Sequence, residues 1–174
     1  MKLSRTIRQV AVFSVTVVLA TTLMAPTASA EDPTPGFNTP AMTWKLIGKG
    51  SQYAWGYLDS KGNYLDGSKT YMMNIPKDPP AEKFWSVVAY DPQTRSELQT
   101  SQPFPSKQSQ RDKMIVNDDG SIDLYFGPEA PAGKEANWTQ TVPDKGWFSV
   151  LRLYSPTEAW YDKSWRPGEI ELVE

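Results

Sequence analysis

The residue types that most enzymes use for nucleophilic and metal chemistry are missing from this sequence of 174 residues, which contains no histidine and no cysteine. A Ser-His-Asp triad, a cysteine nucleophile and a metal site built from imidazole or thiolate are therefore excluded. Catalysis would have to use carboxylates, tyrosine, lysine, arginine or hydroxyl groups. A metal site built from oxygen ligands alone stays compatible with the composition.

Tyrosine and arginine in the expected strands supply one candidate catalytic set. Tyr90, Tyr125 and Tyr154 could act in acid–base chemistry if they met a cation. Arg95 or Arg152 could supply that cation. The other route needs two carboxylates at the separation found in glycosidases. Sequence spacing shows neither set converging, and tyrosine and arginine in strands are more often core and rim residues.

Arg152 interrupts the otherwise apolar run 146–154, which reads GWFSVLRLY. An unpaired charge is costly to bury, so we expect this side chain to meet a carboxylate or to lie at a cavity. Asp91 and Glu129 are the candidate partners. A structural ion pair is the default interpretation, and an arginine that clamps a ligand is the alternative.

Aromatic residues on loops are candidates for ligand binding. Asn137 and Trp138 lie in the connection 127–143, where the indole could stack on a sugar and the amide could bridge hydroxyl groups. The alternative is that Trp138 plugs the end of the fold, since tryptophan is normally well buried. We predict no metal and no cofactor, and the catalytic residues stay unknown. The candidate ligand-binding residues are Trp85, Arg95, Asn137, Trp138, Arg152 and Tyr154.

Two acid-rich segments, 59–63 and 118–123, have the acidic density of a calcium-binding loop. They lack the oxygen spacing and the terminal glutamate of an EF-hand. A tight turn between strands explains each of them.

The elements that must position these residues are short strands. The segment 84–91, FWSVVAYD, is apolar on both faces and lies between prolines, as is typical of a buried central strand. The run 146–154 has the same character. Residues 53, 55 and 57 place aromatic rings on one face of an alternating segment. Further strands are expected at 44–47, 70–75, 95–100, 113–117, 121–126 and 170–173, with 113–126 as a hairpin.

One helix is expected near the C-terminus. Ser155, Pro156 and Glu158 have the pattern of a capping box with proline at the first helical position, so a short helix should run to about Tyr161. About eight short strands spaced by turn signals predict an all-β sandwich or barrel. The segments 101–112 and 127–143 are long loops, and such loops tend to carry function.

The first residues predict export. A basic leader, an apolar run from Val10 to Leu23 and the sequence Ala-Ser-Ala at 28–30 have the pattern of a secretory signal peptide cleaved near Ala30. A membrane anchor is the alternative, although the run is short and interrupted by serine and threonine. We therefore expect a signal peptide at 1–30, a tether at 31–43 and a single domain at 44–174. The product would be periplasmic or extracellular.

Removal of the leader would also remove three basic residues and change the net charge from −2 to −5. A net negative chain is a poor partner for nucleic acid, which requires a basic face. The mature part is long enough for one self-sufficient core and too short for two ordinary domains.

Several long stretches resemble a known family of bacterial proteins. They are LDG at 65–67, PPAEKFWSVVAYDPQTRSELQT at 79–100, NDDGSIDLYFGPEAPAGKEANW at 117–138, QTVPDKGWFSVLRLYSP at 140–156 and DKSWRPGEIELV at 162–173. The sequence resembles the C-terminal domain of two-domain exported proteins of unknown function, over about two thirds of its length. The resemblance implies a jelly-roll-like β-sandwich and no established reaction. Those relatives usually carry a second domain before this one, and the sequence here shows none.

Three functions follow from these observations. The first is a non-catalytic exported domain that binds a glycan, a cell-envelope component or a protein. The second is an enzyme, a hydrolase or a lyase, that acts on a polysaccharide through carboxylate or Tyr–Arg chemistry. The third is a domain that docks onto a separately encoded partner domain. A solvent-exposed Trp85 or Trp138 would favour glycan binding, and an exposed apolar sheet face would favour docking.

Overall fold

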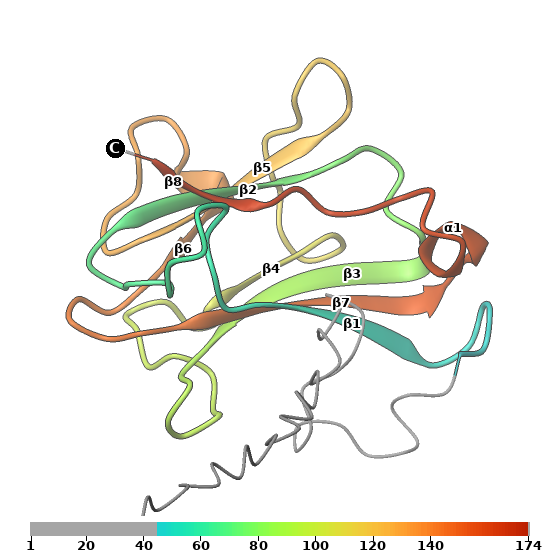
Figure 1. The fold of residues 1–174 in the computed structure, drawn as a ribbon. Coiled ribbons are helices and arrows are strands. Elements are labelled where there is room, and N and C mark those ends of the chain that lie inside the picture. The colour runs from blue at the N-terminus through green and yellow to red at the C-terminus, as the bar shows by residue number, and fades with distance from the viewer. Residues whose placement is uncertain (1–44, 174) are drawn as a thin grey trace, which may run out of the picture.

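Two four-stranded sheets pack face to face in the structure, a computed structural model that describes residues 45–173 (Figure 1). The first sheet has the order β1 (Ser51–Gly56), β7 (Phe148–Pro156), β3 (Ala81–Tyr90) and β4 (Ser106–Gln108). The second has the order β6 (Trp138–Gln140), β5 (Ile122–Gly127), β2 (Thr70–Ile75) and β8 (Ile170–Val173). The predicted all-β sandwich is confirmed. The expected signal peptide and tether lie outside the described residues.

The strand that was expected to be central is central. β3 pairs antiparallel with β7 on one side and with β4 on the other. Its residues Trp85, Val87 and Ala89 face the second sheet and belong to the core, where Leu153 of β7 joins them. Full burial of an aliphatic side chain of this size stabilises the fold by about 1.5–3 kcal/mol, so this shared interior is the main reason the two layers stay together.

The predicted hairpin at 113–126 is only half correct. Its turn is present, because the Asn117 amide donates to the Ser121 carbonyl at 2.8 Å and Gly120 has a φ of 87°. Its second arm is β5, but residues 113–117 form no strand. β5 instead pairs antiparallel with β2 and parallel with β6, a parallel pair that the sequence did not predict.

The predicted C-terminal helix is present but begins later than expected. It is α1 (Glu158–Tyr161), which begins after Thr157 and has no side-chain cap. A separate 3-10 helix, η2 (Glu135–Asn137), precedes β6. The predicted cap residue Ser155 lies inside β7 with a φ of 54°, and its amide donates to the Gly50 carbonyl at 2.9 Å. Strand pairing therefore continues through Pro156, and the predicted capping box is wrong.

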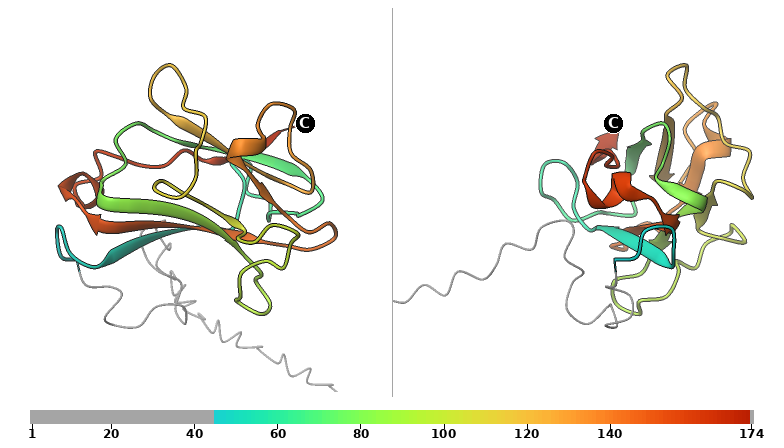
Figure 2. Two further views of the ribbon diagram at one scale, coloured as in Figure 1. Left: turned by 180° about the vertical axis from the view of Figure 1, so that it is seen from behind. Right: turned by 90° about the vertical axis from the view of Figure 1, so that its right-hand side faces the viewer.

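The segments expected to be long loops each contain a short strand. β4 lies within 101–112 and β6 lies within 127–143, and both are edge strands. Residues 95–100, where a strand was expected, fold back onto β3 but form only an isolated bridge, between Tyr90 and Glu97. Figure 2 shows the two layers from behind and from the side, with α1 at one end. Within residues 45–173 there is no helix long and apolar enough to span a membrane.

Candidate functional site

The outer faces of the two sheets differ in chemistry. On the second sheet the outward positions of β2, β5 and β8 are mixed, and they include Asn74, Asp123 and Glu171. On the first sheet many outward positions carry aromatic rings: alternate residues of β1 are aromatic, and β3 and β7 each have an aromatic residue at both ends of their outward row, with Ser86, Val88, Val150 and Arg152 between them. We call this surface the aromatic face, and its residues are Tyr53, Trp55, Tyr57, Phe84, Tyr90, Phe148 and Tyr154.

Rings on the aromatic face stack on one another. The ring centroids of Phe84 and Tyr154 lie 4.0 Å apart, and those of Tyr57 and Phe148 lie 4.8 Å apart. Tyr90 stacks on the same Phe148 ring at 5.4 Å. Each such pair contributes about 0.5–1.5 kcal/mol beyond the burial of its area. One face of each of these five rings therefore already packs against a neighbouring ring.

Arg152 lies at the centre of the aromatic face. Strand register places it opposite Tyr53 of β1 and Ser86 of β3. Its Nη2 donates to the Tyr90 hydroxyl at 2.6 Å, and its guanidinium carbon lies 5.8 Å from the ring centroids of both Tyr53 and Tyr90. Its Nε is buried and has no hydrogen-bond partner among the residues that the structure describes. In that part of the chain it also makes no ion pair with a carboxylate.

The electrostatics of this cluster favour a charged arginine beside a neutral phenol. Burial acts to lower the pKa of Arg152, but the phenols of Tyr90, Tyr154 and Tyr53 outweigh it and raise that pKa. Burial also raises the pKa of Tyr90, against the opposing effect of Arg152. Tyr90 is therefore protonated at neutral pH, which is the wrong state for a general base.

The predicted carboxylate partners of Arg152 are corrected by the structure. Asp91 pairs with Lys145 instead, and its Oδ1 accepts a hydrogen bond from the Gln93 amide at 2.8 Å. Lys145 and these backbone donors lower the pKa of Asp91 to about 2. Glu129 is exposed on the segment 127–143 and makes no ion pair with Arg152. Asp91 is unsuitable because its carboxylate is held by the turn that ends β3.

Of the suggested Tyr–Arg set, the structure brings together Tyr90, Tyr154 and Arg152. Arg95 lies in an exposed turn with a φ of 60°, and Tyr125 lies on the outer face of the second sheet. Neither belongs to the aromatic face.

Asn137, Trp138 and Trp85, which were candidates for ligand binding, hold the fold together. The Asn137 side chain donates to the carbonyls of Ile115 and Asp123, both at 2.8 Å, and accepts from the Ile115 amide at 2.7 Å. Its hydrogen-bonding groups are all used inside the protein. Trp138 is partly exposed, and its Nε1 donates to the Gly127 carbonyl at 2.9 Å. Trp85 is 5% exposed and lies in the core, so its ring offers no surface to a ligand.

Sequence reasoning did not connect the rings that make the aromatic face. The alternation at 53, 55 and 57 was noted, but its partners on β7 and β3 depend on a register that pairs residues about one hundred positions apart. The available signal was the alternation at 53, 55 and 57, together with aromatic residues of matching parity in two other predicted strands, Phe84 and Tyr90, and Phe148 and Tyr154.

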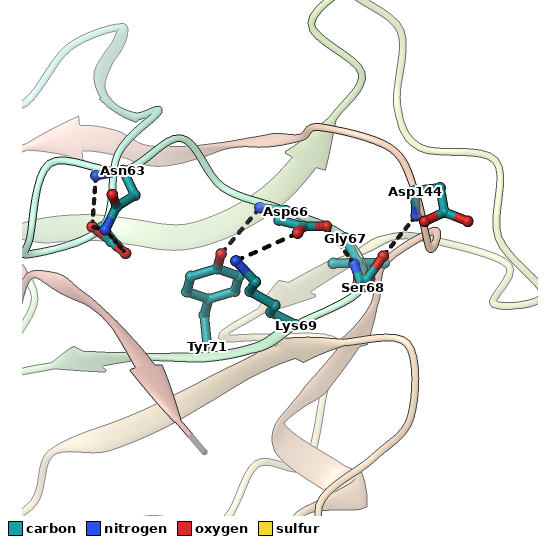
Figure 3. Close-up of polar contacts among 9 residues, drawn as sticks. Asn63, Asp66, Gly67, Ser68, Lys69, Tyr71 and Asp144 are labelled. Atoms are coloured by element: carbon teal, nitrogen blue, oxygen red, sulfur yellow. Dashed lines mark hydrogen bonds and ion pairs between the residues drawn. The ribbon is translucent and has the colours of Figure 1, made fainter.

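Polar contacts of backbone and side chains stabilise the acid-rich segment 59–63 and the loop that follows it, and Figure 3 shows those of Asn63, Asp66 and Tyr71. The Asp59 carboxylate accepts hydrogen bonds from the amides of Lys61 and Asn63, and the Asp66 amide donates to the Tyr71 hydroxyl at 3.1 Å. The Asp59 carboxylate therefore stabilises a turn, as expected for this segment. In residues 45–173 there is no group of three or more acidic side chains suited to hold a metal ion.

The LDG sequence at 65–67 packs this loop against the segment that leads into β7. The Gly67 amide donates to the Lys145 carbonyl at 2.8 Å, and the Thr141 hydroxyl donates to the Gly67 carbonyl at 2.7 Å. A Cβ at this position would lie 2.0 Å from the Val142 carbonyl oxygen. Only glycine allows this approach, so the sequence stretch serves the fold rather than a ligand.

Comparison with known proteins identifies the family. Residues 50–158 match the family model described as "Protein of unknown function (DUF1214)". The chain belongs to this family. The region of the DUF1214 match contains the whole aromatic face and Arg152, and it ends before β8. No curated protein matches the chain.

Two solved structures are similar to this DUF1214 protein. The crystal structure of the VPA0106 protein from Vibrio parahaemolyticus has a TM-score of 0.62 at 24% identity, and the match covers 77% of this chain and 33% of that one. An uncharacterised protein from Burkholderia cenocepacia has a TM-score of 0.47 at 16% identity, with 76% and 32% covered. The chain thus spans about a third of the length of these proteins. The first likeness supports the fold.

Proposed function

We propose that this DUF1214 protein is a non-catalytic binding module that docks a protein partner through its aromatic face. The observation that carries the proposal is the outer face of the first sheet, where aromatic rings surround Arg152, which has no carboxylate partner in the described part of the chain. Protein interfaces are enriched in tyrosine, tryptophan, phenylalanine and arginine, and these residues carry much of the binding free energy.

The geometry favours a protein over a glycan. A sugar binds an aromatic side chain by lying on the open face of the ring. In the pairs Phe84–Tyr154 and Tyr57–Phe148, one face of each ring is covered by the other ring. Of the two rings considered for sugar stacking in the sequence, Trp85 lies in the core, and Trp138 is partly exposed with its Nε1 bonded to the Gly127 carbonyl. A sheet face several strands wide also resembles a protein interface more than the concave sites that bind small molecules.

The partner that best fits is a separately encoded domain. The sequence resembles one domain of proteins that usually carry a second domain, so a domain of that second kind is the partner that we propose. The signal-like segment 1–30 supports export, so the partner would meet this protein in the periplasm or outside the cell.

The Tyr–Arg cluster does not favour an enzyme. Tyr90 is the phenol in hydrogen-bonding contact with Arg152, and burial raises its pKa. A phenol that serves as a base needs a lowered pKa, so the cluster is arranged for binding and not for proton abstraction.

Site-specific photocrosslinking in the producing bacterium tests the proposal. A benzophenone amino acid would replace Tyr53 on the aromatic face, with Met72 on the outer face of the second sheet as the matched control position. We expect a discrete protein adduct from position 53 and none from position 72. The captured protein, purified, should bind the wild type and lose affinity for Tyr53→Ala and Tyr154→Ala. Adducts only with glycan, or equal adducts from both positions, would refute docking at this face.

A further inference from the structure

The positive charge on the aromatic face lacks the partner that a buried charge normally has. Arg152 is the charged residue among the outward positions of β1, of β7 and of β3 from Phe84 to Tyr90. Its described contacts are the hydroxyl and ring of Tyr90, the ring of Tyr53 and the phenol of Tyr154. These groups are neutral and Arg152 is partly buried, so a cation held among neutral rings can serve as a site for an anion.

The Nε–H donor of this guanidinium is unused among the described residues. Nη2 donates to Tyr90, whereas the buried Nε has no acceptor within the described residues. A guanidinium presents its donors in a planar fork that matches the two oxygens of a carboxylate. A buried donor without an acceptor costs about as much as a lost hydrogen bond, and a ligand oxygen would remove that cost.

We infer that the aromatic face binds an acidic peptide segment of the protein partner, in which an aspartate or glutamate pairs with Arg152 and apolar neighbours pack on the surrounding rings. This inference rests on the proposed function and names the chemistry of its partner. A carboxylate fits better than a phosphate, because a phosphate carries nearly two charges and is normally bound by several cations or amides. The aromatic face offers one cation, which matches one carboxylate.

The surroundings of Arg152 strengthen such a pair. Phe84 and Tyr154 stack next to Arg152, and Ser86, its register partner on β3, is 8% exposed. Water has limited access to a site of this kind, so an ion pair formed there is screened less than a pair on an open surface. Tyr90 holds the guanidinium through its hydroxyl and limits its freedom before the ligand arrives.

The test uses peptides selected from a random displayed library against the purified wild-type protein. Selected peptides that lose binding to Tyr53→Ala are then synthesised in matched pairs, with each aspartate or glutamate present or replaced by asparagine or glutamine. We expect the binders to carry an acidic residue beside apolar residues. Amidation of that residue should weaken binding about ten- to a hundredfold, the range for a hydrogen bond to a charged group.

Arg152→Gln is the second arm of the same test. It should weaken binding of the acidic peptide by a similar factor, and it should leave the affinity of the amidated peptide almost unchanged, because the two changes remove one interaction. Arg152→Lys should recover part of the affinity, since it keeps the charge but loses the planar fork. The Arg152 Nε–H signal in NMR spectra should shift with the acidic peptide and not with its amide.

The outcomes separate the inference from the proposed function. Binders that depend on Tyr53 but are indifferent to amidation would overturn the carboxylate pairing and leave docking at the aromatic face intact. Binders whose affinity does not depend on Tyr53 or on Arg152 would overturn both. Because the amidated peptides change the ligand alone, a folding defect in an Arg152 variant cannot imitate the expected result.

Discussion

At Arg152 the free energy of burying a positive charge is offset by phenols and ring faces, where the sequence had suggested a carboxylate. The carboxylate that was expected there, Asp91, directly follows Tyr90 at the end of β3. Alternation along β3 points Tyr90 outward and turns Asp91 the other way, toward Lys145. Because Tyr90 and the next residue, Asp91, point to opposite sides of the sheet, Tyr90 contacts the guanidinium and Asp91 does not.

The pairing of Asp91 with Lys145 predicts a loss of stability in acid. The pKa of Asp91 is about 2 in the folded protein, below its ordinary value of about 3.9, so the ionised form is favoured by folding. Its contribution is present above the ordinary pKa and is lost as the pH falls toward about 2. Thermal melts between about pH 5 and pH 2 should show a smaller decrease of Tm in Asp91→Asn than in the wild type.

Lys145→Gln provides the control for this prediction. It removes the partner but leaves the carboxylate with its backbone donors at Gln93 and Thr94, so its acid dependence should lie between those of the wild type and Asp91→Asn. Coincident melting curves for all three proteins across this pH range would show that the pair does not contribute.

At the scale of elements, side-chain hydrogen bonds replace a strand that the sequence predicted. Residues 113–117 were expected to pair with β5, but the Asn137 amide occupies the backbone of Ile115 and also the carbonyl of Asp123 on β5. One buried side chain thus joins three segments, and β6 becomes the parallel neighbour of β5. The long connection 127–143 has a structural role here.

Asn137→Ala should therefore destabilise the protein. The change leaves an amide and two carbonyls of a part-buried site without their partners, and since an unsatisfied buried group costs about 1–3 kcal/mol, we expect a total loss of about 2 kcal/mol. Chemical denaturation measures this loss, and hydrogen exchange should show faster exchange of the Ile115 amide. Gln110→Ala, which removes an exposed bond to the Lys83 carbonyl, should stay within about 0.5 kcal/mol of the wild type. Equal losses in the two variants would contradict this account.

At the scale of the whole molecule, the core extends beyond the residues that match the family. The match ends at residue 158, whereas Trp165 and Ile170 belong to the core cluster and β8 closes the second sheet beside β2. The sandwich is therefore complete only when the C-terminal segment is included.

Ile170→Ala tests the contribution of that segment. Ile170 is 5% exposed, and truncation of a buried isoleucine to alanine costs about 2–5 kcal/mol because it removes apolar contacts and leaves a cavity. Leu172→Ala is the matched control on the same strand, since Leu172 is 41% exposed and should change the stability much less. If the unfolding midpoints of both variants equalled that of the wild type, β8 would not be part of the cooperative core.

The sequence by itself determined the layer architecture and much of the strand pattern, because both are local consequences of alternation, proline and turn residues. The double-sided apolar run around Val87 was sufficient to predict a central strand, and the rings at 53, 55 and 57 were correctly placed on one face. Local pattern also excluded whole classes of catalyst through the absence of histidine and cysteine.

Only the tertiary structure decided which residues meet. β7 lies between β1 and β3, so Tyr53, Arg152 and Tyr90 come together although they are far apart in the chain. No local rule specifies such a register, because it depends on which strands share the core and on how the connecting segments pack. The same physics removed Asn137 and Trp85 from the candidate site and placed them in the interior, where their hydrogen bonds and apolar area stabilise the fold.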